Sequence, residues 1–183
     1  YMVGFLIKSK GLNDVFDNSK IPEFEWNLKA LRQDQSITFE NRYTRLNYEH
    51  EVDKTNKLSQ SGDDEDEIED VLWISYRQHF FSSILVSEKP IEIAKVYSYD
   101  LVDDETIDTT FTKKYITKFP LVYDSDELLK DMNFYFGPTY AETLKKYNRN
   151  LENSIPFGWG IFGWINKAVF SPLYSWLSSF LSY

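Results

Sequence analysis

Residues 71–86 read VLWISYRQHFFSSILV, the most apolar stretch in the body of the chain. Apolar and aromatic side chains stand next to each other in three runs, at Val71–Ile74, Phe80–Phe81 and Ile84–Val86. Such dense runs are typical of strands buried on both faces of a sheet, whereas a half-buried strand alternates apolar and polar residues. The stretch therefore predicts central strands, with the rest of the body built around them.

Further strands are expected on both sides of this centre. Ile21–Leu31 alternates strictly, with Phe24, Trp26 and Leu28 on one side and charged or amide side chains on the other. Aromatic residues make up 17% of the chain and only seven residues are Gly, which favours a β-rich globular fold because flat rings pack well on pleated surfaces. Strand-like patterns recur in Tyr1–Lys8, Ser36–Tyr48, Ile91–Tyr99, Thr106–Thr117 and Asn133–Phe136.

Charge divides the chain into two parts. Residues 1–152 contain all 29 acidic residues and 19 of the 20 basic residues, a net charge of −10, whereas residues 153–183 contain one charge, Lys167. Because an acidic body is repelled by phosphates, no nucleic acid partner is expected. The run Asp63–Glu67, followed by Glu69-Asp70, predicts a solvated loop over about residues 56–70, since no core accepts such a block of like charge.

Patterns that carry catalysis or bind metals are sparse. The chain has no Cys, which excludes disulfides and thiolate zinc sites, and it has no phosphate-binding glycine motif or nucleophile elbow. The acidic run lacks the mid-loop Gly and the twelfth-position Glu of an EF-hand, and no spacing selects a glycosidase-like carboxylate pair. The only histidines are His50 and His79. We therefore expect no enzyme activity, no metal and no cofactor.

The C-terminal part predicts helices. Gly137-Pro138 marks the change, because Pro fits the first turn of a helix, and residues 138–152 are expected to form a short helix and a connector. Residues 153–183 predict an amphipathic helix with an unusually wide apolar face. Its single polar stripe, at helical spacing, consists of Lys167, Ser171, Ser175, Ser178 and Ser182.

Three interpretations of this last helix remain open: a core helix, a transmembrane span and a helix in the membrane interface. The segment from Trp159 onward is long enough to cross a bilayer at about 1.5 Å per residue. Its serines, Pro172, Lys167 and evenly spread Trp residues are unlike a Leu-rich span, however, and Trp and Tyr favour the headgroup boundary. The interfacial interpretation is preferred, with membrane-facing residues Trp159, Phe162, Trp164, Phe170, Leu173, Trp176, Leu177 and Phe180.

Two parts of the chain resemble the large periplasmic domain of the YidC/Oxa-type membrane protein insertases. Trp73–Phe81 is similar to that family's K-Q-x-F-F type segment, with Arg77 where a Lys is common. The second part consists of Phe136-Gly137-Pro138, the short helix ending in Leu144–Tyr147, Phe157-Gly158-Trp159 and the helix from Phe170 to Phe180. The resemblance is strongest over about residues 71–183.

The resemblance implies a mainly β fold, an antiparallel β-supersandwich of galactose mutarotase type. Residues 1–137 would form part of that domain, followed by two C-terminal helices, the second of which leads to the next transmembrane span. It further implies a module on the periplasmic side of the bacterial inner membrane that assists insertion and folding of inner-membrane proteins by docking and scaffolding. The implied partners are the lipid interface, the Sec translocon with SecDF, and nascent membrane proteins. No catalytic position is carried over.

Two other classes of protein are compatible with the sequence. A carbohydrate-binding or carbohydrate-active β-sandwich would use Trp26 or Trp73 as a stacking platform, although the alternation places Trp26 on an apolar, core-facing side. An unrelated periplasmic chaperone or scaffold domain is the third possibility.

Overall fold

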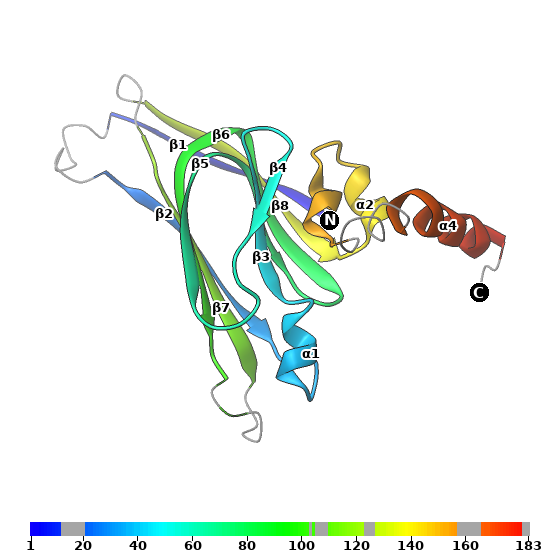
Figure 1. Cartoon of the computed structure of the whole chain (residues 1–183). Coiled ribbons are helices and arrows are strands. Elements are labelled where there is room, and N and C mark those ends of the chain that lie inside the picture. Colours follow the sequence, from blue (N-terminus) through cyan, green and yellow to red (C-terminus); the bar gives the residue numbers. More distant parts are fainter. Residues whose placement is uncertain (12–20, 103, 105–109, 123–126, 157–165, 181–183) are drawn as a thin grey trace.

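The apolar stretch at residues 71–86 forms a central hairpin in the computed structural model of the chain (Figure 1). Its strands are β5 (Asp64–Arg77) and β6 (Phe81–Asp100), which pair antiparallel. Structure is described for residues 1–11, 21–102, 104, 110–122, 127–156 and 166–180. The mainly antiparallel β-sandwich followed by short helices that the sequence predicts is confirmed.

Strand β6 is one long strand where the sequence predicts two. The pairing register with β5 shifts in its middle, where Trp73 lies opposite Val86 but Val71 lies opposite Ile91. Pro90 falls in this irregular stretch and, because it has no N–H, it cannot donate to a regular ladder. The pattern break at Pro90 therefore marks an interruption of the ladder within the strand and not the start of a new strand.

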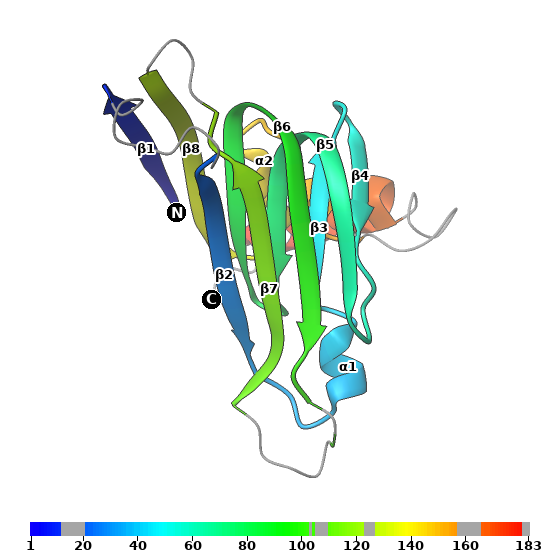
Figure 2. The same cartoon turned by 90° about the vertical axis from the view of Figure 1, so that its left-hand side faces the viewer.

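The sheet forks along β6. Its first half pairs with β8 (Glu127–Pro138), and its second half pairs with β7 (Phe111–Pro120). Strand β1 (Met2–Lys10) then pairs with β8, and β2 (Glu23–Leu31) pairs with β7. On the other side of the hairpin, β3 (Arg45–His50) pairs with β5 and β4 (Lys54–Lys57) pairs with β3 (Figure 2).

The two branches of the fork contact each other through aromatic rings. Phe5 of β1 lies edge-on to Phe24 of β2, with 6.3 Å between ring centroids, and Phe134 of β8 lies edge-on to Trp26 at 5.3 Å. Edge-to-face pairs at these separations stabilise the contact beyond the area that they bury. The β1–β8 branch and the β2–β7 branch thereby enclose the main core, whose largest buried side chains include Tyr48, Tyr76, Tyr115, Phe119 and Met132.

A second core lies on the outer face of the central strands. Trp73, Ile84 and Tyr135 are buried there beneath the helix α2 (Ala141–Lys145) and the 3-10 helix η1 (Leu151–Ser154). The central strands are therefore covered on both faces, as their dense apolar runs predict.

The structure corrects the prediction of a strand over residues 36–48. A short helix, α1 (Ile37–Asn41), occupies the first part, and the strand β3 begins only at Arg45. The Ser36 hydroxyl caps α1 by accepting the N–H of Phe39, at 3.3 Å. This helix-capping bond outweighs the local alternation of apolar residues, which by itself resembles a strand.

The acidic block is also corrected, because it is not a loop. Residues 64–70 belong to β5, and residues 64–69 pair with β6 one by one. The side chains of Glu65, Asp66, Glu67 and Glu69 are nevertheless exposed, while Ile68 is buried between them. Hydrogen bonds to β6 pair the backbone of the block, and only the face of the strand that meets the core needs apolar side chains. The acidic side chains are therefore in solvent, as the sequence predicts, although the backbone forms a regular strand.

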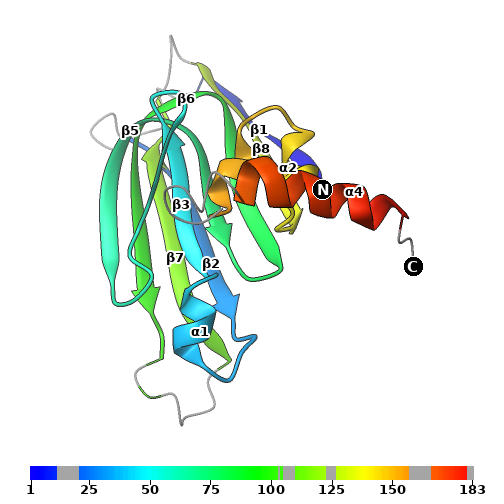
Figure 3. The same cartoon turned by 45° about the vertical axis from the view of Figure 1, so that its right-hand side comes forward.

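The C-terminal part contains short helices in the described residues. Helix α2 covers five residues, and a π-helical turn, η2 (Asn166–Phe170), leads into α4 (Ser171–Phe180). Helix α4 projects away from the sandwich (Figures 1 and 3). Within the predicted helix over 153–183, residues 153 and 154 belong to η1 and residues 166–180 are helical, while residues 157–165 and 181–183 lie outside the described residues.

Candidate membrane-facing site

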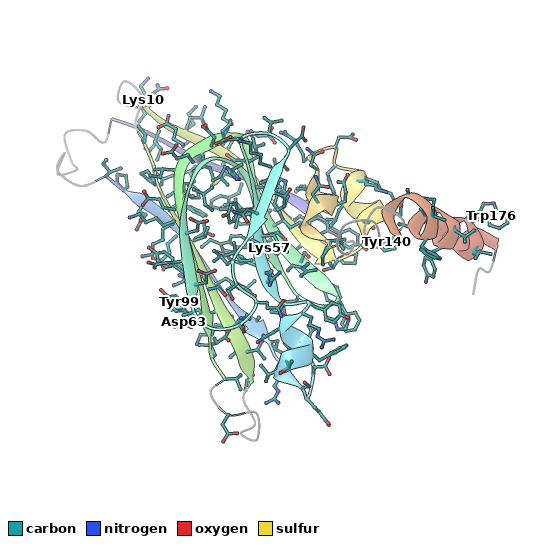
Figure 4. The ribbon with its side chains drawn as sticks, viewed as in Figure 1. Lys10, Lys57, Asp63, Tyr99, Tyr140 and Trp176 are labelled. Carbon is teal, nitrogen blue, oxygen red and sulfur yellow. The ribbon has the colours of Figure 1, made fainter. Side chains whose placement is uncertain are left out.

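Helix α4 and the end of η2, which leads into it, expose an uncharged apolar flank, here called the flank of α4. The exposed fractions are 58% for Phe170, 46% for Leu173, 57% for Trp176 and 42% for Leu177. Figure 4 shows Trp176 near the far end of the helix, pointing away from the sheets. The described part of this flank is thus open and is not enclosed by the protein's own sheets.

The other predicted membrane-facing residues cannot be placed. The side chain of Phe180 lies outside the described part of the structure, although its backbone belongs to α4. Trp159, Phe162 and Trp164 lie entirely outside the described residues.

The structure adds two exposed residues to this flank that the prediction omitted, Val169 and Tyr174. Val169 belongs to the wide apolar face of the helical pattern, so its signal was present in the sequence, whereas Tyr174 lies beside the polar stripe, three residues from Ser171 and four from Ser178. By contrast, Ser171 and Ser175 of the polar stripe are half-buried. On this helix the apolar side chains are therefore more accessible than these two serines, the reverse of a helix that packs its apolar face on a core.

A shallow groove of about 550 Å³ lies between α4 and the end of the connector. It is lined by Ile155 and Pro156 on one side and, on the other, by Phe170 at the end of η2 and by Ser171, Leu173, Tyr174 and Leu177 of α4. None of the helices in the described ranges combines the length and the hydrophobicity needed to cross a bilayer.

The connector that carries this flank is fastened to the sandwich by apolar packing. Leu144 of α2 and Leu151 of η1 have no exposed surface and pack in the outer core with Trp73. Full burial of a Leu side chain stabilises by about 1.5–3 kcal/mol. The two leucines therefore fix the segment between residues 141 and 154 on the outer face of the central strands.

A buried carboxylate adds polar contacts at the same place. Glu49, at the end of β3, is 1% exposed and accepts hydrogen bonds from the indole N–H of Trp73, from the backbone N–H of Asp53 at 2.9 Å and from the side-chain amide of Asn150 at 3.1 Å. The Asn150 amide also donates to the Asp53 carboxylate, at 2.8 Å. A buried carboxylate is tolerated only when such donors surround it, so Asn150 links the connector directly to the sandwich.

Backbone strain is concentrated in the turn beside this carboxylate. Glu51, Val52 and Asp53, between β3 and β4, all adopt left-handed conformations, with φ of 45°, 38° and 68°. Such a conformation is costly for a β-branched residue such as Val52. Because Glu49 and Asn150 both bond to Asp53, they help to hold the turn in this conformation.

The histidines occupy structural positions. The ring of His79 stacks in parallel between Tyr43, at 4.1 Å between centroids, and Phe80, at 4.2 Å. His50 lies near the Tyr48 ring, at 5.8 Å. Among the described residues, no group of three or more His, Asp or Glu side chains is placed to hold a metal ion.

The two tryptophans considered as sugar platforms lie in or against the cores. Trp73 is 1% exposed, so neither ring face is open to a ligand. Trp26 is half-buried and stacks on Tyr76 with 3.9 Å between ring centroids, while Phe134 meets it edge-on. This packing removes the specific basis for the carbohydrate alternative.

These features define a class of protein: an antiparallel β-sandwich domain with a docked helical connector and a projecting amphipathic helix. A family model of the YidC periplasmic domain matches residues 20–172. The chain belongs to this family of domains of the membrane protein insertase YidC, as its resemblance predicts.

Full-length relatives agree with this assignment. The chain is similar to the membrane protein insertase YidC of Parabacteroides distasonis, with 30% identity over 99% of the chain, and of Bacteroides fragilis strain ATCC 25285, with 29% over 97%. The insertase of Azobacteroides pseudotrichonymphae is 31% identical over 98% of the chain. In each case the chain spans 30% of the relative's length.

Proposed function

We propose that this chain is part of the periplasmic domain of an inner-membrane insertase and that it rests in the membrane interface through α4. The observation that carries the proposal is the exposed, uncharged flank of α4, attached by a docked connector to an acidic sandwich. In this role the chain acts as a docking and scaffolding module and not as an enzyme.

The energetics favour a helix that lies along the boundary. Burial of one Leu or Phe side chain contributes about 1.5–3 kcal/mol, so several partly buried side chains supply enough free energy for reversible binding. The net charge of −10 on residues 1–152 keeps the sandwich away from anionic headgroups. The result is a body held in water and a helix held at the lipid surface.

The partners follow from the same arrangement. A sandwich fixed close to the membrane can present its surface to the Sec translocon, to SecDF and to nascent membrane proteins, while the rest of the insertase carries out insertion. The similarity to insertases of which the chain spans 30% supports this division.

A charge placed on the apolar flank tests the membrane contact. Leu173→Asp is expected to lower the fraction of the chain that floats with phosphatidylcholine–phosphatidylglycerol vesicles by at least tenfold, because burying a carboxylate in the acyl region is costly. The matched control is Ser179→Asp, which adds the same charge at an exposed residue that lies next to the polar stripe and outside the apolar flank.

The comparison between the two variants decides the outcome. The proposal predicts that Ser179→Asp still floats at nearly the level of the unmodified chain. Equal loss in both variants, or no loss in either, would contradict a contact made through the apolar flank.

A further inference from the structure

The turn between β5 and β6 is aromatic where most hairpin turns are polar. Gln78 donates its backbone N–H to the carbonyl of Phe81, at 2.9 Å, which leaves His79 and Phe80 as the two central residues of the turn. Gly, Asn, Asp, Pro and Ser dominate such positions because they satisfy the backbone or suit its dihedral angles. The aromatic residues here therefore call for another explanation.

The rings at this turn form a cluster, here called the aromatic tip: Phe39, Phe80 and Phe81 are exposed, and Tyr43 and His79 are half-buried. His79 stacks between Tyr43 and Phe80, and Phe39 lies edge-on to His79 at 5.9 Å. Phe80 and Phe81 remain 60% and 59% exposed, so the stack does not bury them. Two adjacent, strongly exposed Phe side chains on a hairpin end are more typical of an interaction surface than of packing.

The tip is held rigidly beside the connector. The backbone N–H of Thr139 donates to the carbonyl of Phe80, at 2.8 Å. The side-chain hydroxyls of Thr139 and Ser82 form a hydrogen bond with each other, also at 2.8 Å. Thr139 shortly precedes α2, the start of the segment that leads to α4. Figures 1 and 3 show the β5–β6 turn below α2 and α4, on the side of the sandwich from which α4 projects.

The charge near the tip differs from that of the whole chain. Residues 71–87 contain no Asp or Glu, in a protein whose net charge is −9. Arg77 and the exposed Arg42 add positive charge. Burial, and to a smaller extent the charge of nearby Arg45, lower the pKa of Arg77 to about 10, so Arg77 is still cationic at neutral pH. The one carboxylate directly next in sequence to a residue of the tip, Glu40 beside Phe39, is 2% exposed and accepts the N–H groups of Gln33 and Asp34. Aromatic rings beside an exposed cation, with this carboxylate buried, suit an anionic lipid surface, which the rest of the acidic body does not.

We propose that the aromatic tip is a second lipid contact of this domain, inserting Phe80 and Phe81 into the headgroup region beside α4. The proposal extends the membrane placement of α4 and fixes the orientation of the sandwich, because two separate contacts define a tilt that one helix cannot. The partner is the bilayer interface itself.

Single-cysteine labelling tests the proposal directly, because the chain contains no Cys. An environment-sensitive nitrobenzoxadiazole label on Phe80→Cys is expected to shift to the blue when phosphatidylcholine–phosphatidylglycerol vesicles are added. Label on Leu173→Cys reports on α4 in parallel. Label on Val122→Cys is the control, since Val122 is 63% exposed and lies beyond β7, at the opposite end of β8 from the turn.

The outcomes separate the two contacts. Blue shifts at positions 80 and 173, but not at 122, support the tip as a lipid contact. A shift at position 173 alone overturns the tip and leaves the placement of α4 intact, whereas no shift at either position overturns both. A shift at position 80 that grows with protein concentration without vesicles would assign the tip to a protein contact and overturn the proposal.

An unlabelled variant provides an independent measurement. The double variant Phe80→Ser, Phe81→Ser is expected to weaken vesicle binding roughly tenfold, since two exposed Phe side chains lose their apolar contact with lipid. Because both residues are exposed, the far-UV circular dichroism and melting temperature are expected to change little. Unchanged vesicle affinity in a folded double variant would contradict the proposal.

Discussion

Trp73→Ala is expected to lower the free energy of unfolding by about 3–5 kcal/mol, the largest loss expected here of any single substitution. Trp73 is 1% exposed in the outer core, so the truncation leaves a cavity between the sheet and the connector. It also removes the indole donor of the buried Glu49 carboxylate, which adds a penalty for an undersatisfied charge. Urea unfolding followed by circular dichroism measures the loss.

Trp176→Ala is the matched control for this prediction. It removes the same side chain from the exposed flank of α4, where 57% of Trp176 is accessible, so stability should change by less than about 0.5 kcal/mol. A loss below about 1 kcal/mol for Trp73→Ala would show that packing in the outer core does not support the sandwich.

Asn150→Asp is expected to release the connector from the sandwich. The substitution replaces an amide that donates to Glu49 and Asp53, at 3.1 and 2.8 Å, with a carboxylate that repels both. Two hydrogen bonds to charged groups contribute about 1.5–3 kcal/mol each. We therefore expect hydrogen exchange over residues 141–154 to accelerate at least tenfold, with little change in β5.

Asn148→Asp makes the same chemical change two residues earlier. Asn148 also adopts a left-handed conformation, with φ of 53° against 56° for Asn150, so backbone preference cancels between the two variants. If both variants accelerated exchange equally, the effect would come from net charge and not from the contact with Glu49.

The body of the fold follows closely from the sequence. Periodicity alone predicts β2, where Phe24, Trp26 and Leu28 face the core, and the dense runs around Trp73 and Ile84 predict strands covered on both faces. These predictions hold because burial of apolar side chains provides most of the driving force for folding. The pattern of burial can be seen directly in the spacing of apolar residues along the chain.

The sequence predictions are wrong where side-chain hydrogen bonds or pairing with a distant strand determine the secondary structure. Residues 36–41 alternate like a strand, but the cap made by Ser36 starts a helix, and the carboxylate of Glu40 accepts the N–H groups of Gln33 and Asp34, at 3.1 Å each. The acidic block forms a strand because β6 supplies its partner, and that partner is not visible in local composition. The forked pairing of β6 is likewise a property of the assembled sheet.

The candidate site can be predicted in outline. The lack of charge after Glu152, apart from Lys167, and the helical spacing indicate α4 and its wide apolar face, including Leu173 and Trp176. The aromatic tip cannot be predicted in the same way. The apolar run at Phe80-Phe81 resembles a buried strand, and only the turn between β5 and β6 exposes these side chains.

The depth of α4 in a bilayer tests the central claim most directly. Spin labels on Leu173→Cys and Ser179→Cys, on different sides of the helix, can be compared by power-saturation electron paramagnetic resonance with oxygen and with a water-soluble nickel complex as relaxants. The account predicts that, with vesicles, the label at 173 is more accessible to oxygen and the label at 179 to nickel. Equal nickel accessibility at both positions would contradict an interfacial helix.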